Sequence, residues 1–148
     1  MTRAAVVLLA ASMAGAAARL EASCTVSSTG VSFGVYDVFS AAPTDTTGTI
    51  TFRCANSDKN VRVSISRGAS PTFTPRTLQN GAETLAYNLF LDATFAAIWG
   101  DDTGGTATYF NKNPPNANVN VTIFARIPAL QDVSIGAYTD TVVVTIDY

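Results

Sequence analysis

The chain of 148 residues has no histidine, two cysteines and only nine basic residues, and each scarcity excludes a class of function. Without histidine, the Ser-His-Asp and Cys-His mechanisms are unavailable. Two cysteines cannot supply the four ligands of a structural zinc site. Scattered Lys and Arg on a chain of net charge −2 lack the clustered positive charge that phosphate binding requires. We therefore expect no metal, no cofactor and no nucleic-acid partner.

The first residues, 1–22, have the pattern of a secretory signal peptide. One basic residue is followed by an uncharged run rich in Ala, Val and Leu over residues 4–18. This run is shorter than the roughly 20 apolar residues of a membrane-spanning helix, so no permanent membrane anchor is expected. Small residues favour cleavage after Ala18 or Ala22, and residues 23–148 are long and apolar enough for one domain.

Export changes the reading of the two cysteines, because an oxidising compartment favours disulfides. We expect Cys24 to be bonded to Cys54, which joins the first strand of the mature chain to the second. Closing a loop of about 30 residues stabilises a fold by roughly 3 to 4 kcal/mol in the loop-entropy model.

Apolar residues alternate with polar ones in segment after segment, which is the period of a strand with one buried face. The six segments are Val31, Phe33 and Val35; Ile50, Phe52 and Cys54; Val61, Val63 and Ile65; Leu85, Tyr87, Leu89 and Leu91; Val119, Val121, Ile123 and Ala125; and Val142, Val144, Ile146 and Tyr148. A weaker segment, 107–110, is a seventh strand or an extension. Turn signals such as Asn80-Gly81 and Pro114-Pro115 separate the segments. The pattern favours an all-β, immunoglobulin-like antiparallel β-sandwich, with a closed barrel as the alternative.

The final segment, TDTVVVTIDY, is the most strongly β-forming run in the chain. A strand this apolar is disfavoured at an open edge, where unpaired amides invite association. We therefore expect it to be central, with one neighbour supplied either by another molecule or by an early strand of the same chain.

Several separated motifs resemble the spore coat protein U domain family, which also provides the subunit domain of archaic chaperone-usher pili. They are CTVSSTGVSFGVYDVFSAAPTDTTGTITFRC at 24–54, TPRTL at 74–78, YNLFLD at 87–92, WGDDTGGT at 99–106 and ARIPALQDVSIGAYTDTVVVTIDY at 125–148. The resemblance covers nearly the whole mature chain, and the motifs occur in the family's order.

The resemblance implies a secreted, non-enzymatic domain with an incomplete sandwich that lacks its last strand. Its partners would be a periplasmic chaperone, an outer-membrane usher and other pilus subunits, and it would reach the cell surface through the periplasm. A hydrophobic groove would accept a donor strand by β-strand addition. The groove residues implied in this way are Val31, Phe33, Val35, Val142, Val144 and Ile146, although ordinary core positions would show the same pattern.

Cleavage leaves very few residues before Cys24, whereas a donor arm needs roughly ten residues of strand character. We expect a chain that accepts a strand without giving one, at the tip of a pilus, where it would support adhesion or biofilm formation. A self-contained spore or cell coat protein that completes its own sandwich is the alternative.

Few residues offer catalytic chemistry. Asp101 and Asp102 beside Trp99 could form a carboxylate pair or ligate calcium, but GDDTGG is more typical of a solvated turn, and a calcium site needs six to eight oxygens. We expect Trp99 to be a buried plug. Arg53, Arg62 and Arg126 are expected to face solvent. The chain is not expected to be an enzyme.

Overall fold

The computed structural model describes residues 24–55 and 58–148. The predicted signal peptide and its cleavage sites lie outside these residues. Within them there is no helix long and apolar enough to cross a membrane.

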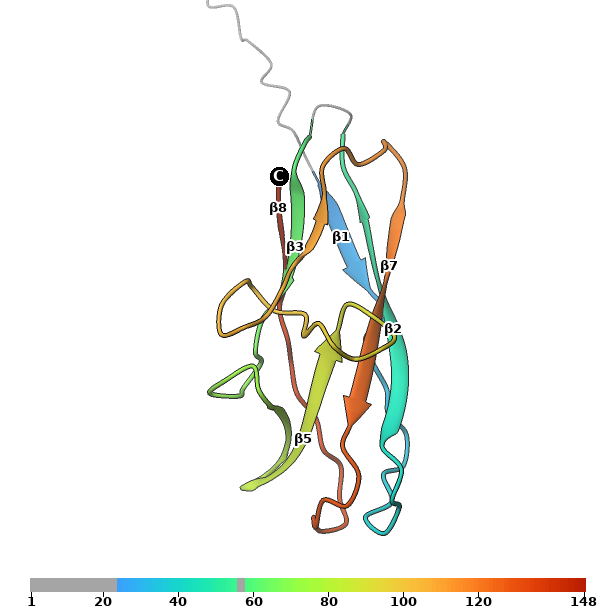
Figure 1. Ribbon diagram of the computed structural model, residues 1–148, viewed down its shortest axis with the longest axis vertical. Coiled ribbons are helices and arrows are strands. Elements are labelled where there is room, and N and C mark those ends of the chain that lie inside the picture. The colour runs from blue at the N-terminus through green and yellow to red at the C-terminus, as the bar shows by residue number, and fades with distance from the viewer. Residues whose placement is uncertain (1–23, 56–57) are drawn as a thin grey trace, which may run out of the picture.

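The described residues form eight strands in two antiparallel sheets (Figure 1). The strands are β1 (Thr25–Ser28), β2 (Thr44–Arg53), β3 (Val61–Ile65), β4 (Arg76–Asn80), β5 (Glu83–Phe90), β6 (Tyr109–Asn111), β7 (Val119–Ile127) and β8 (Val144–Asp147). One sheet has the order β1-β2-β7-β5-β4 and the other has the order β6-β3-β8. The predicted all-β, immunoglobulin-like sandwich with one disulfide is confirmed.

Alternation along the long strands builds the core between the two sheets. In β2 and β7 the register places Ile50 opposite Val121 and Phe52 opposite Val119, so apolar side chains gather on one face. Every second residue of β3 is buried in the same way from the facing sheet. Cross-sheet contact of these faces is the main source of stability, because burying a Val, Ile or Phe side chain contributes about 1.5–3 kcal/mol.

Five of the six predicted strands fall on β2, β3, β5, β7 and β8, and the weaker segment overlaps β6. Two strands were missed. All of β1 is exposed, so its sequence, TVSS, shows no alternation, and it pairs with β2 through its backbone. In β4 the inward position is taken by a charged residue, Arg76, which masks the apolar pattern.

The prediction of a strand over residues 31–35 is wrong, because this segment is extended but is not paired in a sheet. The final strand was expected to be central, with a second neighbour from another molecule or from an early strand of the same chain. No early strand takes that place among the described residues, so a neighbour from another molecule stays a prediction. β8 pairs with β3 alone and forms the edge of the three-stranded sheet. The sandwich is therefore open beside β8, where a complete one would have a further strand.

Candidate functional site: an open groove

A groove of about 1380 Å³ opens along the sandwich between two segments that are far apart in sequence. Residues 30–39 form its first wall and residues 133–144 form its second wall. The loops at the lower end of both walls lie side by side at the bottom of Figure 1. The floor consists of apolar side chains from both sheets: Ile65, Leu78, Leu85, Tyr87, Leu89, Ile123 and Ile127.

The chain after β1 runs beside β2 as far as Gly48 and then separates from it to form the first wall. A Cβ atom on Gly48 would lie 2.3 Å from the carbonyl oxygen of Gly30 and 2.9 Å from Cγ2 of Val31, so only glycine allows this close crossing. Beyond the crossing, the backbone of residues 31–35 makes no hydrogen bond to any described residue. Unpaired N–H and C=O groups on an extended segment are an edge available for strand pairing.

Alternation along the first wall sends some of the predicted side chains inward and one outward. Val31 and Phe33 are half-buried and pack against the core, and the Phe33 ring meets the Tyr87 ring edge-on at 6.0 Å. Gly34 has a φ of +71°, a left-handed conformation that breaks the alternation. As a result Val35, although it borders the groove, is 93% exposed at the rim.

The second wall approaches β4 first and then crosses to β3. Thr139 exchanges two backbone hydrogen bonds with Gln79, at 2.8 and 3.0 Å, and four residues further on the carbonyl of Val143 accepts a bond from the Ser66 N–H at 2.9 Å. Val142 and Val144 line the groove. Ile146 lies outside the lining, opposite Val63 in the β3–β8 ladder, where it packs on the core.

Two carboxylates hold the second wall in place. Glu83 accepts hydrogen bonds from the Ser134 hydroxyl and backbone and from the Tyr138 hydroxyl, and these bonds lower the pKa of Glu83. Asp140 accepts a hydrogen bond of 2.7 Å from the Tyr87 hydroxyl. Burial of the ring and this bond raise the pKa of Tyr87, so the phenol stays protonated.

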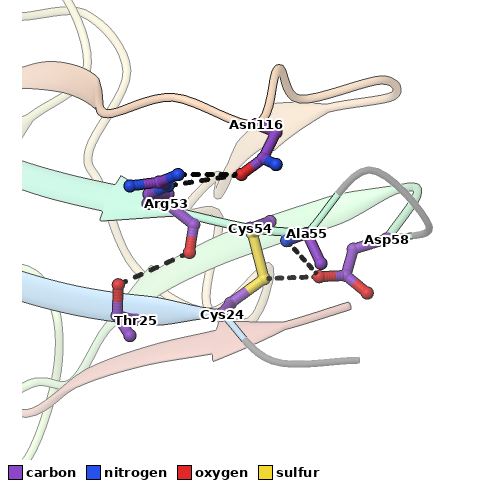
Figure 2. Close-up of a disulfide and its surroundings, with 7 residues drawn as sticks. All are labelled: Cys24, Thr25, Arg53, Cys54, Ala55, Asp58 and Asn116. Carbon is purple, nitrogen blue, oxygen red and sulfur yellow. Dashed lines mark hydrogen bonds between the residues drawn. A yellow bond between two sulfur atoms is a disulfide. The ribbon is translucent and has the colours of Figure 1, made fainter. Parts of the chain in front are cut away.

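The disulfide joins the residue before β1 to the residue after β2 (Figure 2). Cys24 and Cys54 are bonded as predicted, across a sequence separation of 30 residues. The buried Asp58 carboxylate accepts a hydrogen bond from the Ala55 N–H at 2.9 Å and lies 3.6 Å from Cys24 Sγ. Although these three side chains come close enough for a metal site, both sulfurs are committed to the disulfide and have no lone thiolate to offer.

Sequence reasoning missed the role of Arg76, whose side chain is completely buried between the sheets. Its guanidinium donates to the backbone carbonyls of Ser66, Ile65 and Trp99 and to the Asn88 side chain, at 2.6–3.2 Å. Burial lowers the pKa of Arg76. The only sequence signal was an arginine at an inward position of the TPRTL motif.

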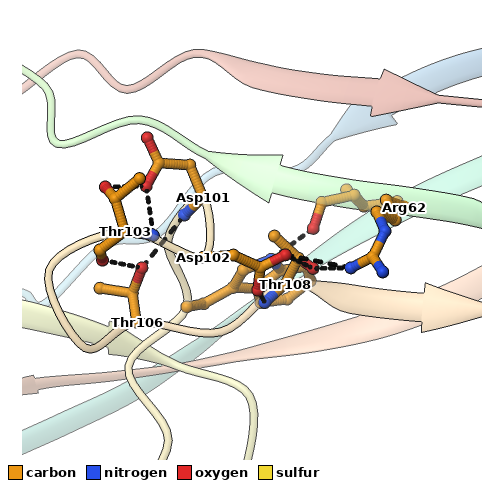
Figure 3. Close-up of polar contacts among 8 residues, drawn as sticks. Arg62, Asp101, Asp102, Thr103, Thr106 and Thr108 are labelled. Carbon is orange, nitrogen blue, oxygen red and sulfur yellow. Dashed lines mark hydrogen bonds and ion pairs between the residues drawn. The ribbon is translucent and has the colours of Figure 1, made fainter.

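The WGDDTGGT motif forms a structural loop. Trp99 is fully buried, as predicted, and its indole N–H donates to the Val63 carbonyl at 2.8 Å. Asp102 pairs with Arg62 at 3.0 Å, whereas Asp101 accepts bonds from Thr103 (Figure 3). Each carboxylate is thus bound by neighbouring residues of this chain, and the two do not face a common cleft.

All three arginines expected to face solvent have defined partners, Arg62 with Asp102 as above. Arg126 pairs with Asp45 through two hydrogen bonds of 2.7 Å, and its guanidinium lies 3.7 Å from the centre of the Phe95 ring. The hydrogen bonds lower the pKa of Asp45. Arg53 donates to Asn116 near the disulfide. The Asp45–Arg126 pair joins the neighbouring strands β2 and β7, the contacts with Phe95 and Asn116 join loops to the same sheet, and none of these residues lines the groove.

The fold defines the class of this protein as an immunoglobulin-like β-sandwich that is open beside its last strand. The chain belongs to the Spore Coat Protein U domain family, whose model matches residues 10–145. It is 30% identical to Protein U of Myxococcus xanthus over 131 residues, which cover 80% of this chain and 71% of that protein. The family resemblance is thereby confirmed.

Solved structures show the same fold. A chain in the complex of CsuC and CsuE, a chaperone–tip adhesion subunit pre-assembly complex from archaic chaperone-usher Csu pili of Acinetobacter baumannii, matches with a TM-score of 0.58 and 22% identity. The match covers 86% of this chain but only 40% of that one. The P pilus rod subunit PapA matches with a TM-score of 0.53 and 14% identity, over 84% of this chain and 98% of PapA. At these identities the likeness is one of fold.

Proposed function

We propose that this protein is a secreted, non-enzymatic structural subunit of an archaic chaperone-usher pilus, whose groove accepts a donor strand from another subunit. The observation that carries the proposal is the pair of unpaired edges that border the groove. The backbone of residues 31–35 has no partner among the described residues, and neither does the outer edge of β8. A strand inserted between them would pair on both sides.

The floor favours the chemistry of such a strand. In β-strand addition, backbone hydrogen bonds supply affinity and alternate side chains enter pockets. Here the walls supply the backbone groups, and apolar side chains such as Leu85 and Ile123 lie beneath them. A strand with apolar residues at every second position therefore complements the groove, and its other side chains would face solvent.

A periplasmic chaperone, an outer-membrane usher and neighbouring subunits are the partners that this function requires. An open groove exposes apolar surface that promotes aggregation, so it must be covered between export and assembly. A fold neighbour was captured with a chaperone before assembly, which supports the same route for this chain. The periplasm in transit and then the cell surface are the proposed locations. A place at the pilus tip, with a role in adhesion or biofilm formation, remains a prediction that N-terminal sequencing of the exported protein tests.

A self-contained spore or cell coat protein is the second candidate. The likeness to Protein U, and the name of the family, favour it. The two functions differ in one physical property, because a coat protein that completes its own sandwich has no use for a donor strand.

A thermal-shift experiment with a designed peptide separates the two candidates. The peptide has about ten residues, the length of a long strand, with Ile and Thr alternating and Lys at each end. A control peptide of the same composition carries its Ile residues in one block. At about 100 times the Kd, a ligand that binds only the folded state stabilises it by about 2.7 kcal/mol, which raises Tm by about 10 °C for a domain of this size.

Matched variants locate the binding. Phe33→Ser removes an inward side chain of the first wall, and Val35→Ser changes an outward one two residues away. We expect the Tm rise in the wild type and in Val35→Ser, and a much smaller rise in Phe33→Ser. Equal Tm with the alternating peptide and the blocked peptide would contradict donor-strand acceptance and favour the coat protein.

A further inference from the structure

The first wall is fastened at its lower end by a single side chain, Tyr36. Its hydroxyl donates a hydrogen bond to the Pro128 carbonyl at 2.9 Å and accepts one from the Gln131 N–H at 2.8 Å. Both partners belong to the loop that follows β7, so these bonds tie the wall to the five-stranded sheet and not to β8. No other hydrogen bond of residues 31–36 joins the wall to the rest of the described chain.

Gln131 makes this anchorage firm. The β5–β7 register would place Pro128 opposite Ala86, but proline has no N–H with which to continue the ladder. The side-chain amide of Gln131 takes its place, accepting from the Ala86 N–H at 2.8 Å and donating to the Ala86 carbonyl at 2.9 Å. The loop that holds Tyr36 is thus itself held to β5.

Two glycines lie along the wall, and glycine backbones reach conformations that other residues rarely adopt. Gly30 and Gly34 have φ values of +72° and +71°, and a Cβ atom on either would meet nothing within 4 Å. The wall also presents alternating apolar residues and unpaired backbone groups, and β8, whose Val144 lines the same groove, has an unpaired outer edge. Exposed edges pair with any compatible strand within reach. The wall can therefore compete with a donor strand for β8.

We propose that Tyr36 is the positioning residue that keeps the groove open. By holding the wall against loop 128–131, its hydroxyl prevents residues 31–35 from closing onto β8 and filling the groove from within. The inference rests on the proposed function, since an open groove has value only if a strand is to enter it. It assigns a role to two polar residues of the family motifs: Tyr36, which lines the groove as part of the first wall, and Gln131, which does not line it.

Tyr36→Phe tests the inference with the smallest possible change, the loss of one hydroxyl. Tyr109→Phe is the matched control, because the Tyr109 hydroxyl makes no hydrogen bond in the described part of the chain. Amide hydrogen exchange is measured on the free, disulfide-bonded proteins. We expect the amides of residues 31–35 to exchange rapidly in the wild type and in Tyr109→Phe, and about tenfold more slowly in Tyr36→Phe, the effect of losing one or two ordinary hydrogen bonds. Because these amides already exchange rapidly in the wild type, a purely structural role of the Tyr36 hydroxyl would leave their exchange unchanged.

The alternating peptide supplies the second readout. Its association rate should fall about tenfold in Tyr36→Phe, because the open state is less populated. Gln131→Ala, which releases the loop from β5, should act in the same direction. Peptide binding by the wild type together with unchanged exchange and association in Tyr36→Phe would overturn the inference and leave the proposed function standing. Failure of the wild type to bind would overturn both, and loss of the whole fold in both variants would show that Tyr36 is a folding element and not a groove support.

Discussion

Arg76→Met removes a buried cation that the sequence alone did not identify, and the structure gives the size of the effect. Four hydrogen bonds from the guanidinium reach acceptors in β3, β5 and the Trp99 loop. Hydrogen bonds to a charged group contribute about 1.5–3 kcal/mol each, but the removal of a desolvated charge returns several kcal/mol. Because the acceptors stay buried and lose their donor, we expect a net loss of about 3–5 kcal/mol in the free energy of unfolding.

Urea denaturation of the disulfide-bonded protein measures this loss. With a slope of about 2 kcal/mol per molar urea, the midpoint should fall by about 2 M. Arg62→Met is the control, since the Arg62 side chain is half exposed and its ion pair with Asp102 should contribute less than about 1 kcal/mol. Midpoints of the two variants within about 0.5 M of one another would refute the view that Arg76 joins the sheets.

Three further predictions concern other parts of the sandwich. Hydrogen bonds, first from the Thr94 hydroxyl, lower the pKa of Asp92 from 3.8 to about 2. The contribution of the ionised Asp92 to stability should therefore be lost as pH falls from about 4 to about 2, and the slope of stability against pH should be shallower in Asp92→Asn. Reduction of the Cys24–Cys54 disulfide should lower the free energy of unfolding by about 3–4 kcal/mol, measured by urea titration with and without reductant. Gly48→Ala should cost about 1–3 kcal/mol and weaken binding of the alternating peptide, because its methyl group collides with the first wall; unchanged binding would show that the crossing does not position that wall.

The sequence was a good guide to the long strands and to the disulfide. Alternation in β2, β3, β5 and β7 is strong because one face of each is buried, and that burial is what the period reports. It failed for β1, which is exposed on both faces. The family resemblance then supplied the groove, which periodicity alone cannot distinguish from an ordinary core.

Residues 31–35 show why the details of the groove could not be predicted from the sequence. Their alternation is real, since Val31 and Phe33 point inward, but strand pairing depends on a neighbour that the segment lacks. The outward turn of Val35 depends on the left-handed Gly34, a backbone choice that the residue type permits without requiring it. Likewise Tyr36 and Gln131 are 95 residues apart, and the sequence around neither residue predicts their hydrogen bond.

Backbone hydrogen exchange of residues 31–35 and of β8 in the wild type, before and after saturation with the alternating peptide, tests donor-strand acceptance most directly. In the free protein, the amides of residues 31–35 and those on the outer edge of β8 should exchange at nearly the rate of an unstructured chain. Saturation with the peptide should slow them at least about 100-fold, as expected for amides in a stable sheet. Strong protection of residues 31–35 and of the outer edge of β8 before any peptide is added, unchanged by the peptide, would show a sandwich that is already complete and would contradict donor-strand acceptance.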